Sequence, residues 1–115
     1  MRGKRNNMDV VYISGKYRGN VNENIEHARR EAIKLWQLGY AVICPHLNTA
    51  NFDGLCNDDV WLNGDLEILK RLYPNRDAIY MLKGWRDSLG AIAEIDLAVR
   101  RDLKILYEED YDTSA

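Results

Sequence analysis

The chain has 115 residues, of which 46% are hydrophobic and 30% are charged, and its formal net charge is -2. These values are typical of a single globular domain with its own core. They argue against a membrane protein, because no apolar run approaches the roughly 20 residues that span a bilayer. They also argue against a nucleic-acid polymer as partner, because no long basic stripe is present.

A basic segment, residues 1–8, opens the chain, and no apolar segment follows it. This pattern differs from that of a signal peptide, so we expect a disordered lead-in and a cytoplasmic protein. In that compartment Cys44 and Cys56 are expected to stay reduced. Together with His46 they are possible zinc ligands, but a fourth ligand at a regular spacing is missing. We therefore expect no metal ion and no cofactor.

The first predicted unit is a strand, a glycine loop and a helix. Residues 10–14 are a short β-branched run that ends at Gly15, which predicts a strand covered on both faces. The loop from Gly15 to Asn20 contains two glycines and two cations. Asn20 or Asn22 then caps a helix whose apolar residues repeat every three and four positions until Gly39.

The second unit has a long connection between its strand and its helix. A strand over residues 40–44 ends at Pro45, and residues 45–57 form a connection of a length that usually carries function or is mobile. A helix follows over residues 58–72, where Asp65 interrupts an apolar stripe. Burying a lone carboxylate is costly, so Asp65 is either an edge residue turned to water or a group held for a purpose.

The third unit turns from a strand over residues 78–82 into a helix over residues 89–101. Ser88 is a good N-cap, and small side chains leave the face around Glu94 bare. Either that face holds a ligand, or the small residues only pack the helix on its sheet while Glu94 points to water. A last strand over residues 104–107 precedes an acidic tail, residues 108–115, which we expect to be solvated coil.

Strands that alternate with helices predict one α/β domain over residues 9–107. Right-handed crossovers then give a parallel sheet of about four to five strands with helices on both faces. In such a sheet the loops that follow the strands meet at one edge, where ligands bind. We therefore expect Tyr12, Arg18 and Glu94 to lie within reach of one another.

Three motifs carry a family resemblance. Residues 12–19 (YISGKYRG), 64–67 (GDLE) and 87–95 (DSLGAIAEI) resemble the nucleoside 2-deoxyribosyltransferase superfamily, including its 2-deoxynucleoside 5′-monophosphate N-glycosidase branch. The loop over residues 45–49 (PHLNT) also looks like that of short bacterial and phage members of this superfamily. The resemblance spans roughly residues 10–107. It implies a flavodoxin-like fold and cleavage of the bond between a nucleobase and deoxyribose.

The resemblance also implies catalytic roles. Glu94 matches the nucleophile that attacks C1′ of the sugar while the base departs, leaving a glycosyl ester for water or a second base to resolve. Tyr12 matches the tyrosine that holds this carboxylate. Asp65 matches an aspartate that faces the sugar and base. An alternative is a sensor or sequestering protein that binds a nucleotide without efficient catalysis.

The resemblance also links the residue at position 88 to the substrate that a member of the superfamily takes. Members that take unphosphorylated nucleosides have an aspartate at this position, and members that take monophosphates have a serine. A hydroxyl at a helix start can bind a phosphate, and Arg18 would add a charge-assisted contact. His46 and Trp85 either contact the base or are an ordinary loop histidine and a packed tryptophan. The full predicted binding set is Gly15, Tyr17, Arg18, Gly19, His46, Asn48, Trp85, Asp87, Ser88 and Gly90.

Members of the superfamily usually assemble so that a neighbouring subunit closes the site. The three tryptophans and seven tyrosines of this chain are more than a core of this size needs. We therefore expect a homodimer or a larger homo-oligomer, with a small-molecule nucleoside or nucleotide as ligand.

Overall fold

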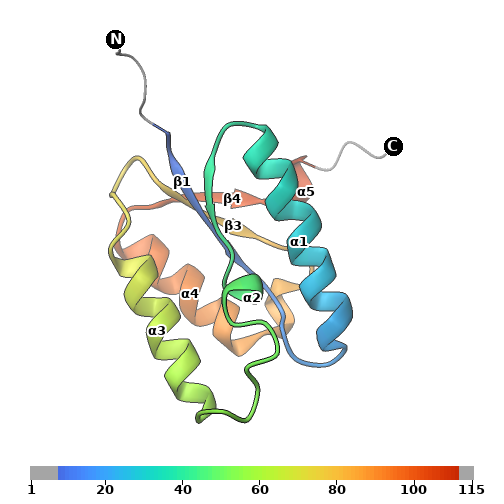
Figure 1. Cartoon of the computed structure of the whole chain (residues 1–115). Coiled ribbons are helices and arrows are strands. Elements are labelled where there is room, and N and C mark those ends of the chain that lie inside the picture. Colours follow the sequence, from blue (N-terminus) through green and yellow to red (C-terminus); the bar gives the residue numbers. More distant parts are fainter. Residues whose placement is uncertain (1–7, 112–115) are drawn as a thin grey trace.

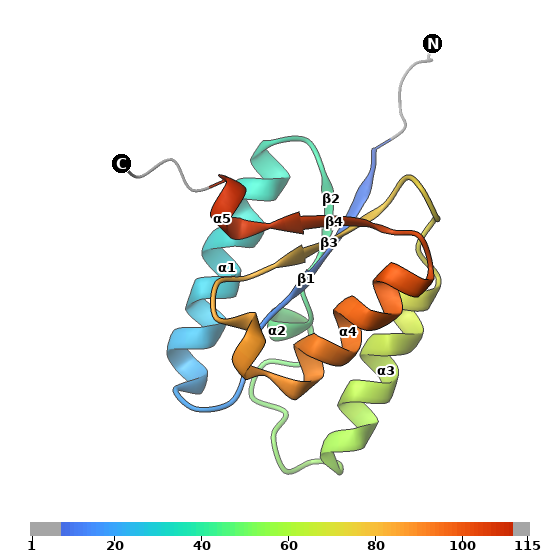
Figure 2. The same ribbon diagram turned by 180° about the vertical axis from the view of Figure 1, so that it is seen from behind.

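The computed structural model describes residues 8–111, which form a parallel sheet between two layers of helices (Figure 1). The strands are β1 (Val10–Ser14), β2 (Ala41–Ile43), β3 (Ala78–Met81) and β4 (Lys104–Tyr107), in the order β2-β1-β3-β4. Helix α1 (Val21–Gln37) packs on one face of the sheet, and α3 (Asp58–Lys70) and α4 (Leu89–Arg100) lie on the other (Figure 2). This is the predicted flavodoxin-like α/β fold, with four strands.

The alternation of side chains along β1 divides the core into two halves. Val11 and Ile13 point towards α1, where they join one buried cluster. Tyr12 points the other way and packs with residues of β3, α3 and α4. Because strand side chains alternate with a period of two, Ser14 lies on the same face as Tyr12. The side chains of Tyr12 and Ser14 therefore both lie on the face of the sheet that α4 covers.

Helices α1 and α4 both begin with a side-chain cap that the sequence predicted. The Asn20 side chain accepts a hydrogen bond from the backbone N of Glu23 at 3.2 Å, and the Ser88 Oγ accepts one from the backbone N of Ala91 at 3.1 Å. The predicted loop after β2 is partly helical. It begins with the short helix α2 (Pro45–Asn48), because proline at the first helical position is already in a helical backbone conformation.

The prediction of a solvated acidic tail is wrong for its first four residues. Glu108–Tyr111 form the short helix α5, and Glu108 is buried. Its carboxylate is stabilised inside the protein because it accepts hydrogen bonds from His27 and from the backbone N of Lys83. Residues 1–7 of the expected lead-in and residues 112–115 of the tail lie outside the described part of the chain. Between residues 8 and 111, no helix is both long and apolar enough to cross a membrane.

Candidate active site

A crevice of about 580 Å³ opens at the edge of the sheet where β1 ends. Its walls come from the loop after β1, from α2 and the loop that follows it, from α3, and from the start of α4. These are the segments that a parallel sheet was expected to bring together. A volume of this size lies in the range of about 300–1,000 Å³ that is usual for small-molecule sites.

Glu94 lies in this crevice and is only 7% exposed. The Tyr12 Oη donates a hydrogen bond to Glu94 Oε2 at 2.6 Å, and the Ser14 Oγ donates one to Oε1 at 2.6 Å. Burial raises the pKa of Glu94 to about 7, with a smaller contribution from nearby Asp65, although the two hydrogen bonds act to lower the pKa. The carboxylate is therefore fixed in orientation and costly to ionise, and it is not turned to open water.

Small side chains make room for this carboxylate. Ala91 and Ala98 of α4 are buried against the sheet, so the helix approaches β1 closely. A Cβ atom added to Gly90 would already be in van der Waals contact with Ser88 Oγ at 3.8 Å and with Leu62 Cδ1 at 3.9 Å. The interpretation that small residues only pack the helix explains Ala98, whereas Ala91 and Gly90 also line the crevice.

Asp65 faces the crevice from α3 and is half-buried. Burial raises the pKa of this carboxyl to about 6. Asp65 is thus partly shielded from water, and its carboxyl lies at a wall of the crevice. The charge of Asp65 also adds to the cost of ionising Glu94, because two carboxylates that line one cavity repel each other.

Ser14 is a site residue that sequence analysis did not name. It is 1% exposed and contacts the carboxylate oxygen that Tyr12 leaves unbound. The signal was available, since Ser14 stands two positions after Tyr12 on the same strand and therefore on the same face. Phe52 and Trp61 were not assigned to the site either. Their rings lie 6.0 Å apart and form an aromatic wall of the crevice.

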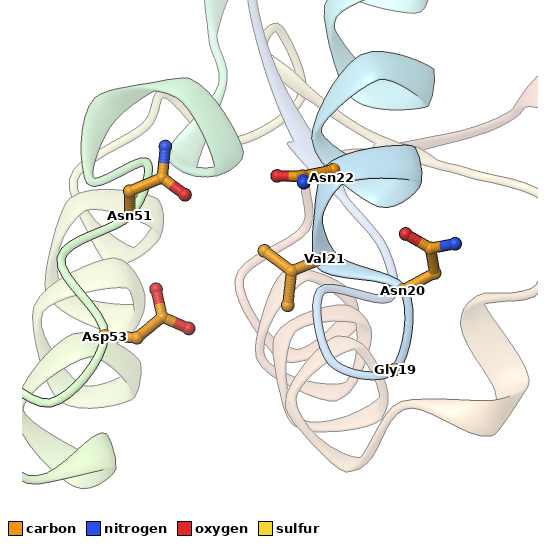
Figure 3. A pocket seen from close by; sticks show the side chains of 6 residues that line it. All are labelled: Gly19, Asn20, Val21, Asn22, Asn51 and Asp53. Carbon is orange, nitrogen blue, oxygen red and sulfur yellow. The ribbon is translucent and has the colours of Figure 1, made fainter.

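The predicted binding residues divide into two groups. Three of them do not line the crevice, namely Gly19, Asn48 and Trp85, and the others do, namely Gly15, Tyr17, Arg18, His46, Asp87, Ser88 and Gly90. Asn48 ends α2 and is exposed. Gly19 lines a separate hollow between the start of α1 and the loop after α2, where Asn51 and Asp53 point towards the helix (Figure 3).

Arg18 is exposed and forms an ion pair with Asp58, at the start of α3. Both residues line the crevice, so the ion pair joins the loop after β1 to the start of α3. A second contact joins the same loop to the loop after α2, since the Tyr17 Oη donates a hydrogen bond to Asp53 Oδ1 at 2.6 Å. The glycine loop is thus held to the loop after α2, and Arg18 already has an anionic partner.

His46 supports the glycine loop. It is 6% exposed, and its Nε2 lies 3.0 Å from the carbonyl oxygen of Lys16, to which it must donate. Burial lowers the pKa of His46, so the ring is neutral and its Nδ1 is an acceptor. Within the described residues Nδ1 has no hydrogen-bond partner. His46 therefore lines the crevice and also positions the loop opposite it.

Trp85 is a packed tryptophan and not a wall of the crevice. Its ring packs against that of Tyr107, with 6.4 Å between the centroids, and the Arg86 guanidinium lies 4.6 Å from its centre. Of the two alternatives left open for Trp85, the packed tryptophan is the one that agrees with these contacts. For metals, no group of three or more His, Cys, Asp or Glu side chains suited to an ion occurs among residues 8–111. Cys44 and Cys56 are both free thiols.

The fold and the crevice define a flavodoxin-like α/β domain that holds a buried glutamate at the binding edge of its sheet. Residues 9–107 match the model of the family described as "Domain of unknown function (DUF4406)", and the chain belongs to this family. The search among curated proteins found no match.

Proposed function

We propose that the protein cleaves the N-glycosidic bond of a 2-deoxynucleoside or of its 5′-monophosphate, with Glu94 as nucleophile. The observation that carries this proposal is the buried Glu94 carboxylate, which two hydroxyl groups hold at 2.6 Å each inside a crevice of nucleoside size. The motif resemblance to nucleoside 2-deoxyribosyltransferases points to the same reaction. The fold alone would not, because one fold hosts many activities.

In the proposed reaction one Glu94 oxygen attacks C1′ as the bond from C1′ to the base nitrogen breaks. Positive charge develops on the sugar in this transition state, and an adjacent carboxylate stabilises it. Tyr12 and Ser14 keep the attacking group in one orientation, which removes an entropic cost from the reaction. The electron pair of the broken bond leaves with the base. Water or the nitrogen of a second base then attacks C1′, the bond from C1′ to the Glu94 oxygen breaks, and the proton that the attacking group loses passes to Asp65.

Asp65 is proposed to supply a proton to the departing base. Its pKa of about 6 keeps a useful protonated fraction near neutral pH, unlike an ordinary aspartate. Glu94 must be ionised at the same time, and its pKa is about 7. Because the two carboxyl groups interact, the pair titrates as one system. Glu94 has the higher pKa of the two, so the reactive form, with the proton on Asp65 and the charge on Glu94, is the less populated of the two singly protonated forms.

Ser88 favours a 5′-monophosphate as substrate. Its Oγ accepts a hydrogen bond from Ala91 N, which leaves the hydroxyl proton available for a phosphate oxygen at the start of α4. Arg18 lines the same crevice, but Asp58 neutralises part of its charge. Asp87 also lines the crevice and would repel a phosphate. A neutral nucleoside is therefore kept as the second proposed substrate.

A homo-oligomer in the cytoplasm is part of the proposal. Leu89 lines the crevice and is 86% exposed, and Leu55, two residues after the crevice residue Asp53, is 74% exposed. Such exposure is unusual for leucine and suits a surface that another subunit covers. Light scattering at micromolar concentration tests this point. A monomeric mass would contradict the proposed assembly without touching the proposed reaction.

The test incubates the protein with paired 2-deoxynucleosides and monophosphates, with and without a second free base, and identifies the products by chromatography. Release of free base supports hydrolysis, and a new nucleoside made from the added base supports transfer. Asp96→Asn is the matched control for Glu94→Gln, because Asp96 lies on the same helix but is exposed and paired with Arg100. Tight binding without any base release would favour the sensor alternative.

A further inference from the structure

Glu108 is a buried acid that the proposed reaction does not use. It begins α5, one residue beyond the part of the chain that matches the family model, and is 7% exposed. Its Oε1 lies 2.8 Å from His27 Nε2 and accepts a hydrogen bond from the backbone N of Lys83 at 2.8 Å. Burial acts to raise the pKa of Glu108, but the hydrogen bonds from His27 and Lys83 outweigh it and hold the pKa below its ordinary value. A single carboxylate thus joins three segments far apart in sequence.

The backbone N of Lys83 lies at the beginning of the connection from β3 to the crevice. After β3, Leu82 still packs in the cluster on the α1 face, whereas Trp85 packs in the cluster on the α4 face. The chain changes sides of the sheet within these few residues, with Gly84 in the left-handed region at φ 88°. The same connection ends at Asp87 and Ser88, which line the crevice. Its path therefore depends on how its first residue is held, together with the hydrogen bonds inside the connection from Trp85 N to the Leu82 carbonyl and from Ser88 N to the Trp85 carbonyl.

The C-terminal turn is itself docked on the protein. The Tyr111 ring packs edge-on against Tyr80, with 5.6 Å between the centroids, and Tyr80 donates a hydrogen bond to Glu31 at 2.7 Å. These contacts keep α5 against the face that α1 covers, beside the end of β4 (Figure 1). Glu108 therefore contacts the connection from a helix that is itself packed against the rest of the protein.

We infer that Glu108 is a positioning residue for the crevice. Through Lys83 N it fixes the connection over residues 83–88 and so places Asp87 and Ser88 at the crevice wall. Its effect on substrate rests on the proposed function, but its effect on the connection does not. Glu94 is anchored separately, because its two hydrogen bonds come from β1. Loss of Glu108 should therefore weaken substrate binding more than it slows the chemical step.

The experiment compares Glu108→Ala and Glu108→Gln with Glu109→Ala, an exposed neighbour in the same turn. Hydrogen exchange measured by mass spectrometry follows peptides over residues 83–90, with β1 as an internal reference for global opening. We expect Glu108→Ala to speed exchange in 83–90 at least about tenfold relative to β1, because a hydrogen bond to a charged acceptor is lost. Glu108→Gln should restore most of the protection, since its amide oxygen can accept from Lys83 N.

Kinetics give the second readout. We expect KM to rise roughly three- to tenfold in Glu108→Ala while kcat changes by less than about twofold. Exchange in 83–90 that matches wild type, or that rises only together with β1, would overturn the inference. So would a KM equal to that of wild type in an active enzyme. If the wild-type protein releases no base from any compound, the proposed function fails, and the exchange data still decide whether Glu108 holds the connection.

Discussion

Replacing Glu94 with glutamine should make the protein more stable relative to wild type as pH rises from acidic to alkaline values. The pKa of Glu94 is about 7 in the folded protein, against an ordinary value of 4.5. The folded state therefore binds this proton more tightly than the unfolded state does. The resulting stability is complete below about pH 4.5 and is lost as pH rises to about 7. At roughly 1.4 kcal/mol per pH unit, ionising the buried Glu94 costs about 3 kcal/mol above pH 7.

Glutamine has the same shape and never ionises, so Glu94→Gln avoids this cost. Relative to wild type, its free energy of unfolding should rise by about 2–3 kcal/mol between about pH 5 and about pH 8.5. Urea unfolding at a series of pH values measures this change, and any constant effect of altered hydrogen bonding cancels from it. Asp96→Asn provides the baseline, because its carboxylate stays in contact with water. A Glu94→Gln difference that does not change with pH would refute the account of Glu94 burial.

Three other substitutions have defined outcomes. Asp65→Asn removes a repelling charge, so the pKa of Glu94 falls and the acidic limb of the kcat/KM profile moves to lower pH; an unmoved limb would mean that the two groups do not interact. Ser14→Ala removes a hydrogen bond that lowers the pKa of Glu94, so the same limb moves to higher pH, and a shift the other way would contradict the assigned contact. Gly15→Ala places a Cβ 2.7 Å from Leu82 Cδ1 and should cost about 1–3 kcal/mol in urea unfolding through overpacking; unchanged stability would show that Leu82 moves aside freely.

The fold was predictable because its signals are local and repeated. Short β-branched runs separated by helical periodicity and glycine stops specify parallel strands, and the sheet order then brings their following loops together. Tyr12 and Glu94 are 82 positions apart in sequence, and their meeting followed from this topology together with the motif resemblance. Strand alternation also predicts that Ser14 lies on the same face of the sheet as Tyr12.

The remaining features depend on contacts that no local pattern encodes. Acidic residues at a chain end usually stay in water, and Glu108 is buried only because His27 and Lys83 N happen to face it. Trp85 lies in the connection that leads from β3 to the crevice. Its ring nevertheless packs against Tyr107, because the connection crosses to the other face of the sheet. Whether Arg18 is available to a ligand likewise depends on its pairing with Asp58.

The measurement closest to the central proposal is the mass of the Glu94 peptide during turnover. The protein is mixed with a 2-deoxynucleoside or monophosphate from which it releases base, quenched with acid and digested. We predict that the peptide containing Glu94 carries a deoxyribosyl ester in the wild-type protein, and that Glu94→Gln forms no ester and releases no base while remaining folded. Base release by Glu94→Gln at the wild-type rate, or an ester on another residue, would contradict the assignment of Glu94 as nucleophile.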